Sequence, residues 1–269
     1  MTTYDNLLTG MEAAAREAGE LLGKLPRPVA AATFDGYARA WRELEAPVVA
    51  VLRDRLATLR PHVGWTEELD SLAALPADGE MWCVDVVDGA VQFMQGLPQF
   101  CVSLALVRDG RPVAAVLHAP LFGETYLAAH GLGATRDGRP VRPSVKTDAA
   151  AAIVATSQPP LIARQPEAAH EAGRSLTAVL PHVGAVRNLG PTSWQIADTA
   201  AGRLDAFWQY GRDDTNLLAG VLIAREAGAV VTDLHGDPWS AGADGSLVAS
   251  AHLHGRLLDI LTEGGAPRR

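Results

Sequence analysis

The segment Trp82–Phe93 constrains this chain most, because it combines an apolar run, two acids and a glycine in a short space. It reads WCVDVVDGAVQF, so a carboxylate at Asp85 is followed by a second at Asp88 and then by Gly89. This order predicts a strand that carries two carboxylates to its carboxyl end, followed by a helix. Because α/β proteins bind ligands at the carboxyl ends of strands, we expect a functional site here.

Asp85 and Asp88 have two interpretations from the residues alone. Hard cations such as Mg²⁺ take oxygen ligands, so two carboxylates and a backbone carbonyl suit them. A helix that begins near Gly89 would offer free amides to an anion, which makes a phosphate site. The alternative is that the two acids cap a turn or pair with arginine. Both interpretations stay open at this point.

Composition restricts the possible partners. The chain has 269 residues, a net charge of −8 and scattered Lys and Arg, which argues against non-specific nucleic-acid binding. Cys83 and Cys101 both lie in apolar runs, as expected in a reducing compartment. No apolar run is long enough to span a membrane, and the N-terminus does not resemble a secretory signal. We therefore expect a cytoplasmic protein without nucleic-acid or membrane partners.

The hydrophobic pattern predicts a mixed fold. Helical spacing covers residues 9–25 and 34–59, where Pro47 predicts a kink or a break into two helices. Strands and hairpins follow up to Ser144, and strands and helices then alternate. The class is α/β or α+β, with an N-terminal half of residues 1–144 and a C-terminal half of residues 145–269 packed as one compact unit.

Two motifs resemble the signatures of the inositol monophosphatase family. The first signature, W-x-x-D-P-I-D-G-T-x-N-F followed by x-x-G-x-P, is matched at Trp82, Asp85, Asp88, Gly89, Phe93, Gly96 and Pro98. The second, W-D-x-A-A-G followed by E-A-G-G, resembles residues 215–220 and 226–229. The resemblance runs in order along nearly the whole chain. It implies a layered α-β-α-β-α sandwich of the inositol monophosphatase and fructose-1,6-bisphosphatase type, and a homodimer.

The resemblance also implies an activity, the Mg²⁺-dependent hydrolysis of a small phosphate monoester. By position, the metal ligands would be Glu67, Asp85, the carbonyl of Val87, Asp88 and Asn216. Gly89 and Ala90 would bind phosphate, and the catalytic group would comprise Glu67, Asp85, Asp88 and Ala90. Gln209 falls at a polyol-binding position, and Trp208 beside it is a candidate for the same pocket wall.

Three of these positions depart from the family pattern. Asn216 is neutral where the family has an aspartate, so one Mg²⁺ site is expected and the second is weakened. Ala90 lacks the hydroxyl of the usual threonine, which works with the glutamate matched by Glu67 to orient water. Gln209 replaces an acid, which indicates a substrate other than inositol phosphate. Asp213 and Asp214 either supply the missing charge or cap a helix expected to begin at Leu217.

Three hypotheses of function follow. The first is a metal-dependent phosphatase for a small phosphorylated substrate other than inositol phosphate. The second is a degenerate family member that binds a ligand or regulates a partner without hydrolysis. The third is a repurposed enzyme of specialised metabolism that uses Glu67, Asp85 and Asp88 as acid–base groups.

Overall fold

The computed structural model describes residues 3–25, 32–67 and 75–263. Its helices are α1 (Thr3–Lys24), α2 (Phe34–Leu59), α3 (Ala90–Met94), α4 (Pro166–Val179), α5 (Thr192–Ala200), α6 (Asp214–Glu226) and α7 (His254–Glu263), with 3-10 turns at Ala149–Ala151 and Ile162–Arg164. Its strands are β1 (Gly64–Glu67), β2 (Glu80–Asp88), β3 (Cys101–Arg108), β4 (Arg111–Ala119), β5 (Glu124–Ala129), β6 (Gly133–Arg136), β7 (Arg139–Pro140), β8 (Ile153–Thr156), β9 (Ala185–Arg187), β10 (Ala206–Tyr210), β11 (Val230–Thr232) and β12 (Gly245–Ala249).

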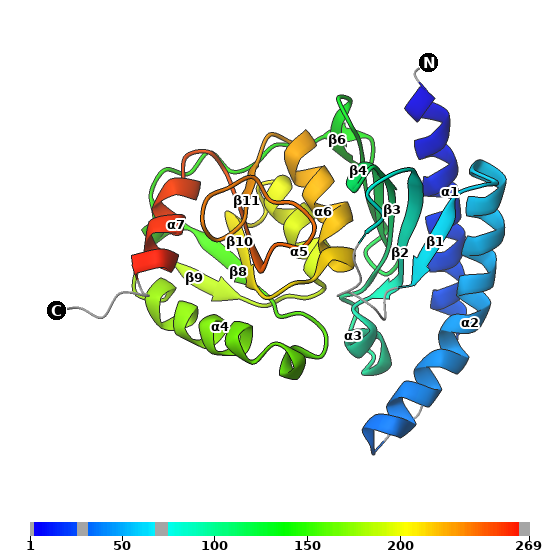
Figure 1. Cartoon of the computed structure of the whole chain (residues 1–269), viewed down its shortest axis with the longest axis horizontal. Coiled ribbons are helices and arrows are strands. Elements are labelled where there is room, and N and C mark those ends of the chain that lie inside the picture. The colour runs from blue at the N-terminus through cyan, green and yellow to red at the C-terminus, as the bar shows by residue number, and fades with distance from the viewer. Residues whose placement is uncertain (1–2, 26–31, 68–74, 264–269) are drawn as a thin grey trace.

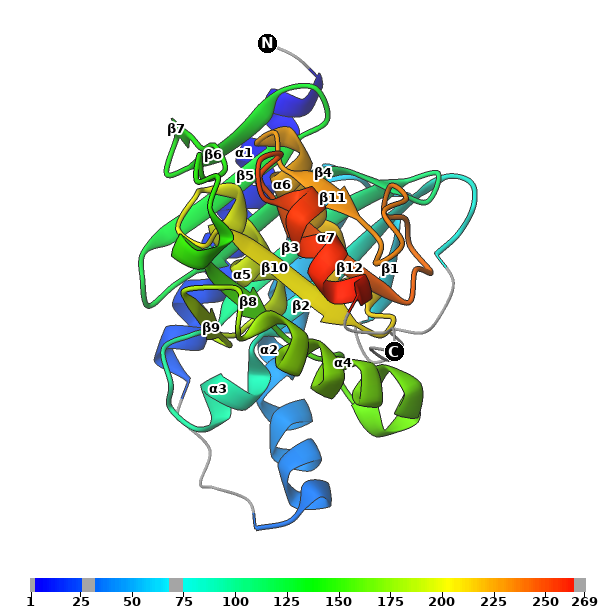
Figure 2. The ribbon, with the colours of Figure 1, turned by 90° about the vertical axis from the view of Figure 1, so that its left-hand side faces the viewer.

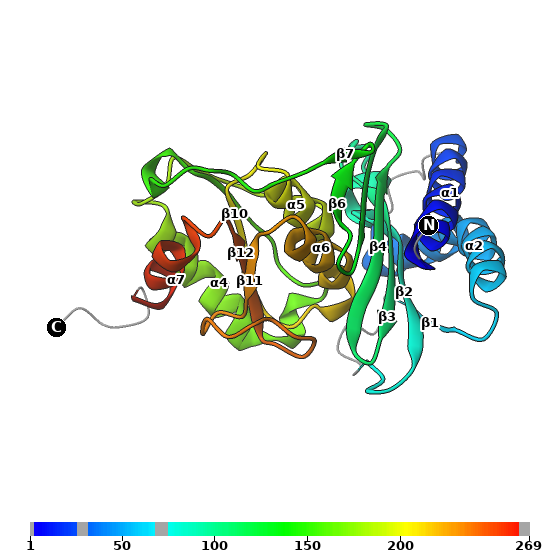
Figure 3. The same ribbon diagram turned by 90° about the horizontal axis from the view of Figure 1, so that it is seen from above.

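These elements stack as alternating helix and sheet layers, which confirms the predicted fold class. Helices α1 and α2 cover one face of the first sheet, α5 and α6 lie between the two sheets, and α4 and α7 cover the far side (Figure 1). The view from above in Figure 3 shows the same order of layers. The two buried helices α5 and α6 therefore pack between the two sheets and join them.

The first sheet has seven strands in the order β1-β2-β3-β4-β5-β6-β7. Strand β1 pairs with β2 in parallel and the remaining neighbours are antiparallel. The β3–β4 hairpin turns at Asp109-Gly110 and the β6–β7 hairpin at Asp137-Gly138, where all four residues have positive φ. The Asp-Gly pairs predicted these turns correctly, because glycine and aspartate tolerate that conformation.

The second sheet has five strands in the order β11-β12-β10-β8-β9. Strands β9, β8 and β10 are parallel, and α4 and α5 connect them as crossovers. Strand β12 pairs antiparallel with β10 and β11. The carboxyl end of β10 leads directly into the start of α6, which places Gln209 close to Asp213 in the chain.

The core divides along the layers. One buried cluster joins α1 and α2 to the first sheet, a central cluster surrounds α5 and α6, and a third joins the second sheet to α4 and α7. On β10, Phe207 belongs to the central cluster and Trp208 to the third, since successive strand residues point to opposite faces. Figure 2 shows α4 and α7 in front of that outer face.

Helix α2 runs unbroken through Pro47, so the alternative of two consecutive helices was wrong. Its 26 residues and the 22 of α1 give long helices over the first sheet. None of the described helices combines the length and the hydropathy that a membrane span needs.

Candidate active site

Asp85 and Asp88 share one face of the first sheet because β2 is irregular between them. In a regular strand, residues three apart point to opposite faces. Asp85 lies opposite Ser103 of β3, whereas Asp88 lies opposite Cys101, so three steps on β2 face two on β3. Since Ser103 and Cys101 point the same way, this bulge brings both carboxylates to the face that packs against α5 and α6. Both aspartates are buried.

Asp85 closes part of the turn that follows it. Its Oδ1 accepts a hydrogen bond from the backbone N of Val87 at 2.9 Å. The hydrogen bond that the turn-capping interpretation of Asp85 requires is therefore present. A carboxylate has several acceptor sites, so this bond leaves the side chain able to hold a cation as well.

Asp88 is bound by the start of α5. Its Oδ2 accepts hydrogen bonds from the backbone N of Ser193 at 3.1 Å and from the Ser193 hydroxyl. The same hydroxyl lies 3.6 Å from Sγ of Cys101. Burial raises the pKa of Asp88 to about 7, the bonds from Ser193 oppose the rise, and the charge of Asp213 adds to it. Asp88 therefore sits close to a second carboxylate from across the fold.

Gly89 makes the passage from β2 to α3 possible. Its φ of 95° lies in the left-handed region, and a Cβ at this position would lie 2.8 Å from the carbonyl oxygen of Gln99. No other residue fits this conformation and this close approach without strain. The predicted glycine turn is thus a geometric necessity. The helix that follows has five residues from Ala90, whose methyl side chain has no hydroxyl to offer.

The start of α6 carries the opposing groups. Its first turn lies against β2, where Sγ of Cys83 is 3.8 Å from the carbonyl oxygen of Thr215. Asp213 accepts a hydrogen bond from Nε2 of Gln209 at 2.8 Å on one oxygen and from Nδ2 of Asn216 at 2.7 Å on the other. The amide oxygens of Gln209 and Asn216 have no hydrogen-bond partner among the described residues.

The predicted helix cap was wrong in two respects. Helix α6 begins at Asp214, three residues before the expected Leu217, and Asp213 occupies the N-cap position without a side-chain bond to the helix backbone. Its carboxylate instead lies between the two amide groups. Burial raises the pKa of Asp213 to about 6, the bonds from Gln209 and Asn216 lower it, and the charge of Asp214 adds a smaller rise.

Asp214 has different partners from Asp213. One of its oxygens accepts from the backbone N of Gly242 at 2.7 Å, and the other accepts from Nε of Arg212 at 2.9 Å. The guanidinium also forms an ion pair with the carboxylate. The charge of Asp214 is thus compensated locally, whereas no cationic side chain is bonded to Asp213 or Asp88 among the described residues.

The donor atoms fit a hard cation by their chemistry. Asp85 and Asp88 provide buried carboxylates, and Asn216 provides an amide oxygen that no described donor satisfies. Among the described side chains, no group of three His, Cys, Asp or Glu residues is arranged to hold one ion. Glu67 ends β1 beside β2, where it pairs with Val84, but its side chain lies outside the description. Amide and carbonyl oxygens would thus have to complete the coordination.

The two expected substrate contacts lie on opposite faces of β10. Gln209 faces α6 and has no exposed surface. Trp208 is 2% exposed in the outer core cluster, and its indole Nε1 donates to the Ser175 hydroxyl at 2.9 Å. The structure therefore places Trp208 away from the aspartates, and its packing gives no support for a substrate contact.

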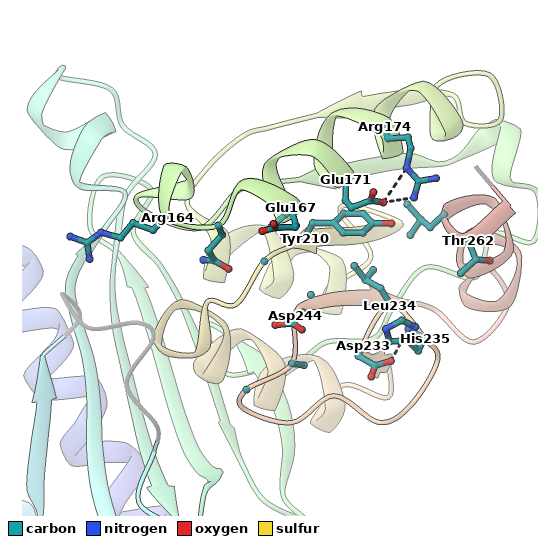
Figure 4. A pocket seen from close by; sticks show the side chains of 17 residues that line it. Arg164, Glu167, Glu171, Arg174, Tyr210, Asp233, Leu234, His235, Asp244 and Thr262 are labelled. Atoms are coloured by element: carbon teal, nitrogen blue, oxygen red, sulfur yellow. Dashed lines mark hydrogen bonds and ion pairs between the residues drawn. The ribbon is translucent and has the colours of Figure 1, made fainter. Parts of the chain in front are cut away.

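A separate cavity lies on the outer side of the second sheet, between α4, α7 and the loops around β11 and β12. Its volume is about 860 Å³, and Glu167, Glu171 and Arg174 point into it from α4, with Tyr210 beneath them (Figure 4). Glu171 and Arg174 neutralise each other in an ion pair. Neither Asp85 nor Asp88 lines this cavity, so it is distinct from the carboxylate site.

Sequence reasoning missed Ser193 as a partner of Asp88. The two residues are 105 positions apart, and they meet only because the start of α5 packs against the end of β2. A hydroxyl side chain at the start of a helix was the available signal, but it does not indicate which acid it would contact. Gly220 of α6 permits the close packing of α5 against α6, since a Cβ there would lie 2.9 Å from Cβ of Ile196.

Comparison with known proteins agrees with the arrangement of these elements. The model of the inositol monophosphatase family matches residues 5–265. An inositol-1-monophosphatase of Rhizobium meliloti is 30% identical over 219 residues, which cover 78% of each chain. The Nus factor SuhB of Escherichia coli K12 is 32% identical over 236 residues, which cover 83% of each chain.

Solved structures show the same fold. An inositol monophosphatase from Anabaena superposes with a TM-score of 0.82 at 24% identity, with 97% of both chains covered. SuhB of Mycobacterium tuberculosis superposes with a TM-score of 0.78 at 28% identity, also with 97% of both chains covered. From the extent of these matches, the chain belongs to the inositol monophosphatase family.

Proposed function

We propose that this protein hydrolyses a small phosphate monoester other than inositol phosphate with the help of a divalent cation. One observation carries the proposal. The bulge in β2 turns Asp85 and Asp88 to the same buried face, where Asp88 meets the charge of Asp213. Burying like charges together is costly, so the acids are either protonated or compensated by a bound cation, and we propose the cation.

Mg²⁺ is the cation that we propose. Asp85, Asp88, the carbonyl of Val87 and Oδ1 of Asn216 would hold it, with Glu67 at the neighbouring edge of the sheet. When bound, it supplies a Lewis acid for the phosphoryl oxygen and lowers the pKa of a water molecule. One cation is proposed. A second would bind weakly, because Asn216 contributes an oxygen but no charge.

The residues around the cation have separate roles. The left-handed turn at Gly89 fixes where β2 ends and α3 begins, and thereby where a phosphate could approach the backbone. Ala90 cannot orient water, so we expect slow turnover. Loss of one oriented polar group costs about 10²–10³ in rate at sites of this kind.

A substrate other than inositol phosphate is proposed because of Gln209. Its amide nitrogen is held by Asp213, and the side chain has no exposed surface. It therefore offers no carboxylate to the hydroxyl groups of a polyol. A smaller or less hydroxylated alcohol would lose fewer hydrogen bonds at this position.

A second candidate function is ligand binding or regulation without hydrolysis, or a different reaction in the same pocket. Ala90 and Asn216 favour it, because each lacks a group that serves hydrolysis in the family pattern. Ser193 favours it as well, because its hydrogen bond already uses one oxygen of the Asp88 carboxylate. Some relatives carry the name Nus factor SuhB and not that of a phosphatase. A homodimer, a cytoplasmic location and the lack of a nucleic-acid partner stay predictions.

The test is phosphate release from a broad panel of small phosphate esters with and without Mg²⁺ or Mn²⁺. We expect cation-stimulated release that falls at least about 100-fold in Asp88→Asn. Asp198→Asn is the matched control, since Asp198 is also buried but bonds Tyr126 and Arg203. The Asp198→Asn variant should keep the rate of phosphate release within about threefold of that of the unaltered protein.

The outcomes separate the candidates. No release from any ester by a folded protein would refute the phosphatase. A shift in melting temperature with an ester, without turnover, would favour the binding protein. Turnover of another substrate without a cation, reduced by Asp85→Asn, would favour the repurposed enzyme.

A further inference from the structure

The side chain of Asn216 has a fixed orientation. Its Nδ2 donates to Asp213 at 2.7 Å, and the side chain is 4% exposed. The reverse orientation would set the amide oxygen against a carboxylate oxygen, which are both acceptors. The carboxylate therefore determines that Oδ1 of Asn216 points away from Asp213. That oxygen has no hydrogen-bond partner within the described part of the chain.

Gln209 holds Asp213 from the other side. Its Nε2 donates to the second carboxylate oxygen at 2.8 Å, and its Oε1 is likewise unpaired in a side chain with no exposed surface. Each oxygen of Asp213 thus receives an amide N–H, and each amide presents an unsatisfied oxygen. Buried acceptors are rarely left without a donor or a cation, so these oxygens indicate a ligand.

Of the neighbouring acids Asp213 and Asp214, only Asp213 carries a negative charge that is not compensated by a bonded cation in the parts of the chain that are described. Asp214 is bonded to Arg212 and to the backbone of Gly242, so its charge is compensated outside the cluster. Among the described residues, Asp213 is bonded to two neutral amides and to no cationic side chain, and its negative charge acts on Asp88. The first turn of α6 also lies against β2, as the contact between Cys83 and Thr215 shows.

We propose that Asp213 is a positioning residue for the cation and that Asn216 is the ligand it positions. Asp213 fixes Asn216 with Oδ1 available and supplies the negative charge that an amide lacks. The oxygen and the charge, which one carboxylate usually provides together, thus come from two side chains. Side chains behind metal ligands commonly orient them in this way, and their loss costs about 10–100-fold in affinity. This inference rests on the proposed cation-dependent function.

The test is the binding of Mn²⁺ to the full chain, measured from the electron paramagnetic resonance of free Mn²⁺ without substrate. Asp213→Asn should weaken binding by about 10–100-fold. Asp214→Asn, the same change at the adjacent buried acid, should stay within about threefold of the unaltered protein. The exchange Asp213→Asn with Asn216→Asp should restore binding to within about threefold, because the charge moves to the ligand itself.

Folding is checked by circular dichroism on each variant before titration. If Asp213→Asn does not fold, Asn216→Ala replaces it, since this change leaves Asp213 bonded to Gln209 but removes the proposed ligand oxygen. It should weaken binding by a similar factor.

Three results would overturn the inference. Binding that Asp213→Asn, or Asn216→Ala in its place, leaves unchanged would overturn it alone. So would an equal loss in Asp214→Asn, or an exchanged pair that folds but fails to regain affinity. No Mn²⁺ uptake by the unaltered protein would overturn the proposed function together with the inference.

Discussion

The segments Trp82–Phe93 and Gln209–Asn216 meet at the candidate site but hold their acids differently. Asp88 is positioned mainly by the backbone, through the bulge in β2 and the amide of Ser193, with the Ser193 hydroxyl as a further donor. Asp213 is held by side chains, the amides of Gln209 and Asn216. The first arrangement depends on main-chain geometry and the second on rotamers.

This difference determines how easily each acid could change its position in the sequence. An acid set by a bulge and a left-handed glycine cannot move without rebuilding the strand. Asp213 and Asn216 lie three apart across the first turn of α6, where side chains at such spacing are neighbours. A charge can therefore shift between these two positions while the backbone stays the same.

The largest expected effect concerns the stability of the cation-free protein. The pKa values of Asp88 and Asp213 rise to about 7 and about 6 from values near 3.8. Folding therefore favours their protonated forms. The stability that they contribute is complete below about pH 4 and is lost as pH rises through the folded pKa values.

We expect Asp88→Asn to gain stability over the unaltered protein by a few kcal/mol between pH 4 and about 7, and Asp213→Asn to complete its gain by about pH 6. Urea unfolding with a chelator present measures this difference. Saturating Mg²⁺ should reduce it. A difference that does not change with pH would show that the two acids do not share a buried site.

A smaller effect is expected at the turn of the first segment. Gly89→Ala should cost about 1–3 kcal/mol of unfolding free energy and lower any phosphate release, because φ is positive and the new methyl would meet Gln99. Gly79→Ala is the control. Gly79 also has positive φ, but nothing lies near its missing Cβ, so about 1 kcal/mol is expected. Equal losses in urea unfolding would argue against the close approach at Gly89.

The smallest effect is expected from restoring a hydroxyl beside Gly89. Ala90→Thr should raise phosphate release about tenfold, less than the roughly 10²–10³ that an oriented polar group contributes, because Asn216 still weakens the cation site. Ala90→Val has the same shape without the hydroxyl and should give no gain. A similar rate in both variants would mean that the α6 segment, and not Ala90, limits the reaction.

Much of the fold followed from local sequence signals. The Asp109-Gly110 and Asp137-Gly138 turns were predicted where they occur, because two-residue hairpins need those residue types. The start of α6 was placed three residues too late, since Asp213 and Asp214 were interpreted as a cap before Leu217, whereas Asp214 already lies in the buried first turn. The boundary at residue 144 stays a prediction.

The site was predicted only in part, because its decisive contacts are long-range. The spacing of Asp85 and Asp88 contains no sign of the bulge that aligns them, and Ser193 reaches Asp88 only after both sheets have packed. Likewise, the orientation of the Asn216 amide depends on Asp213. Periodicity and residue type locate the acids, but the choice among their partners is made by tertiary packing.

The most direct test is a crystal structure of the protein grown with Mn²⁺ and phosphate, with anomalous scattering used to locate the metal. We predict an anomalous peak in contact with Asp85, Asp88 and Oδ1 of Asn216, while Asp213 stays bonded to the Asn216 amide and outside direct contact. Crystals without a peak at this position, or a peak bound by Asp213 with Asn216 turned away, would contradict the account.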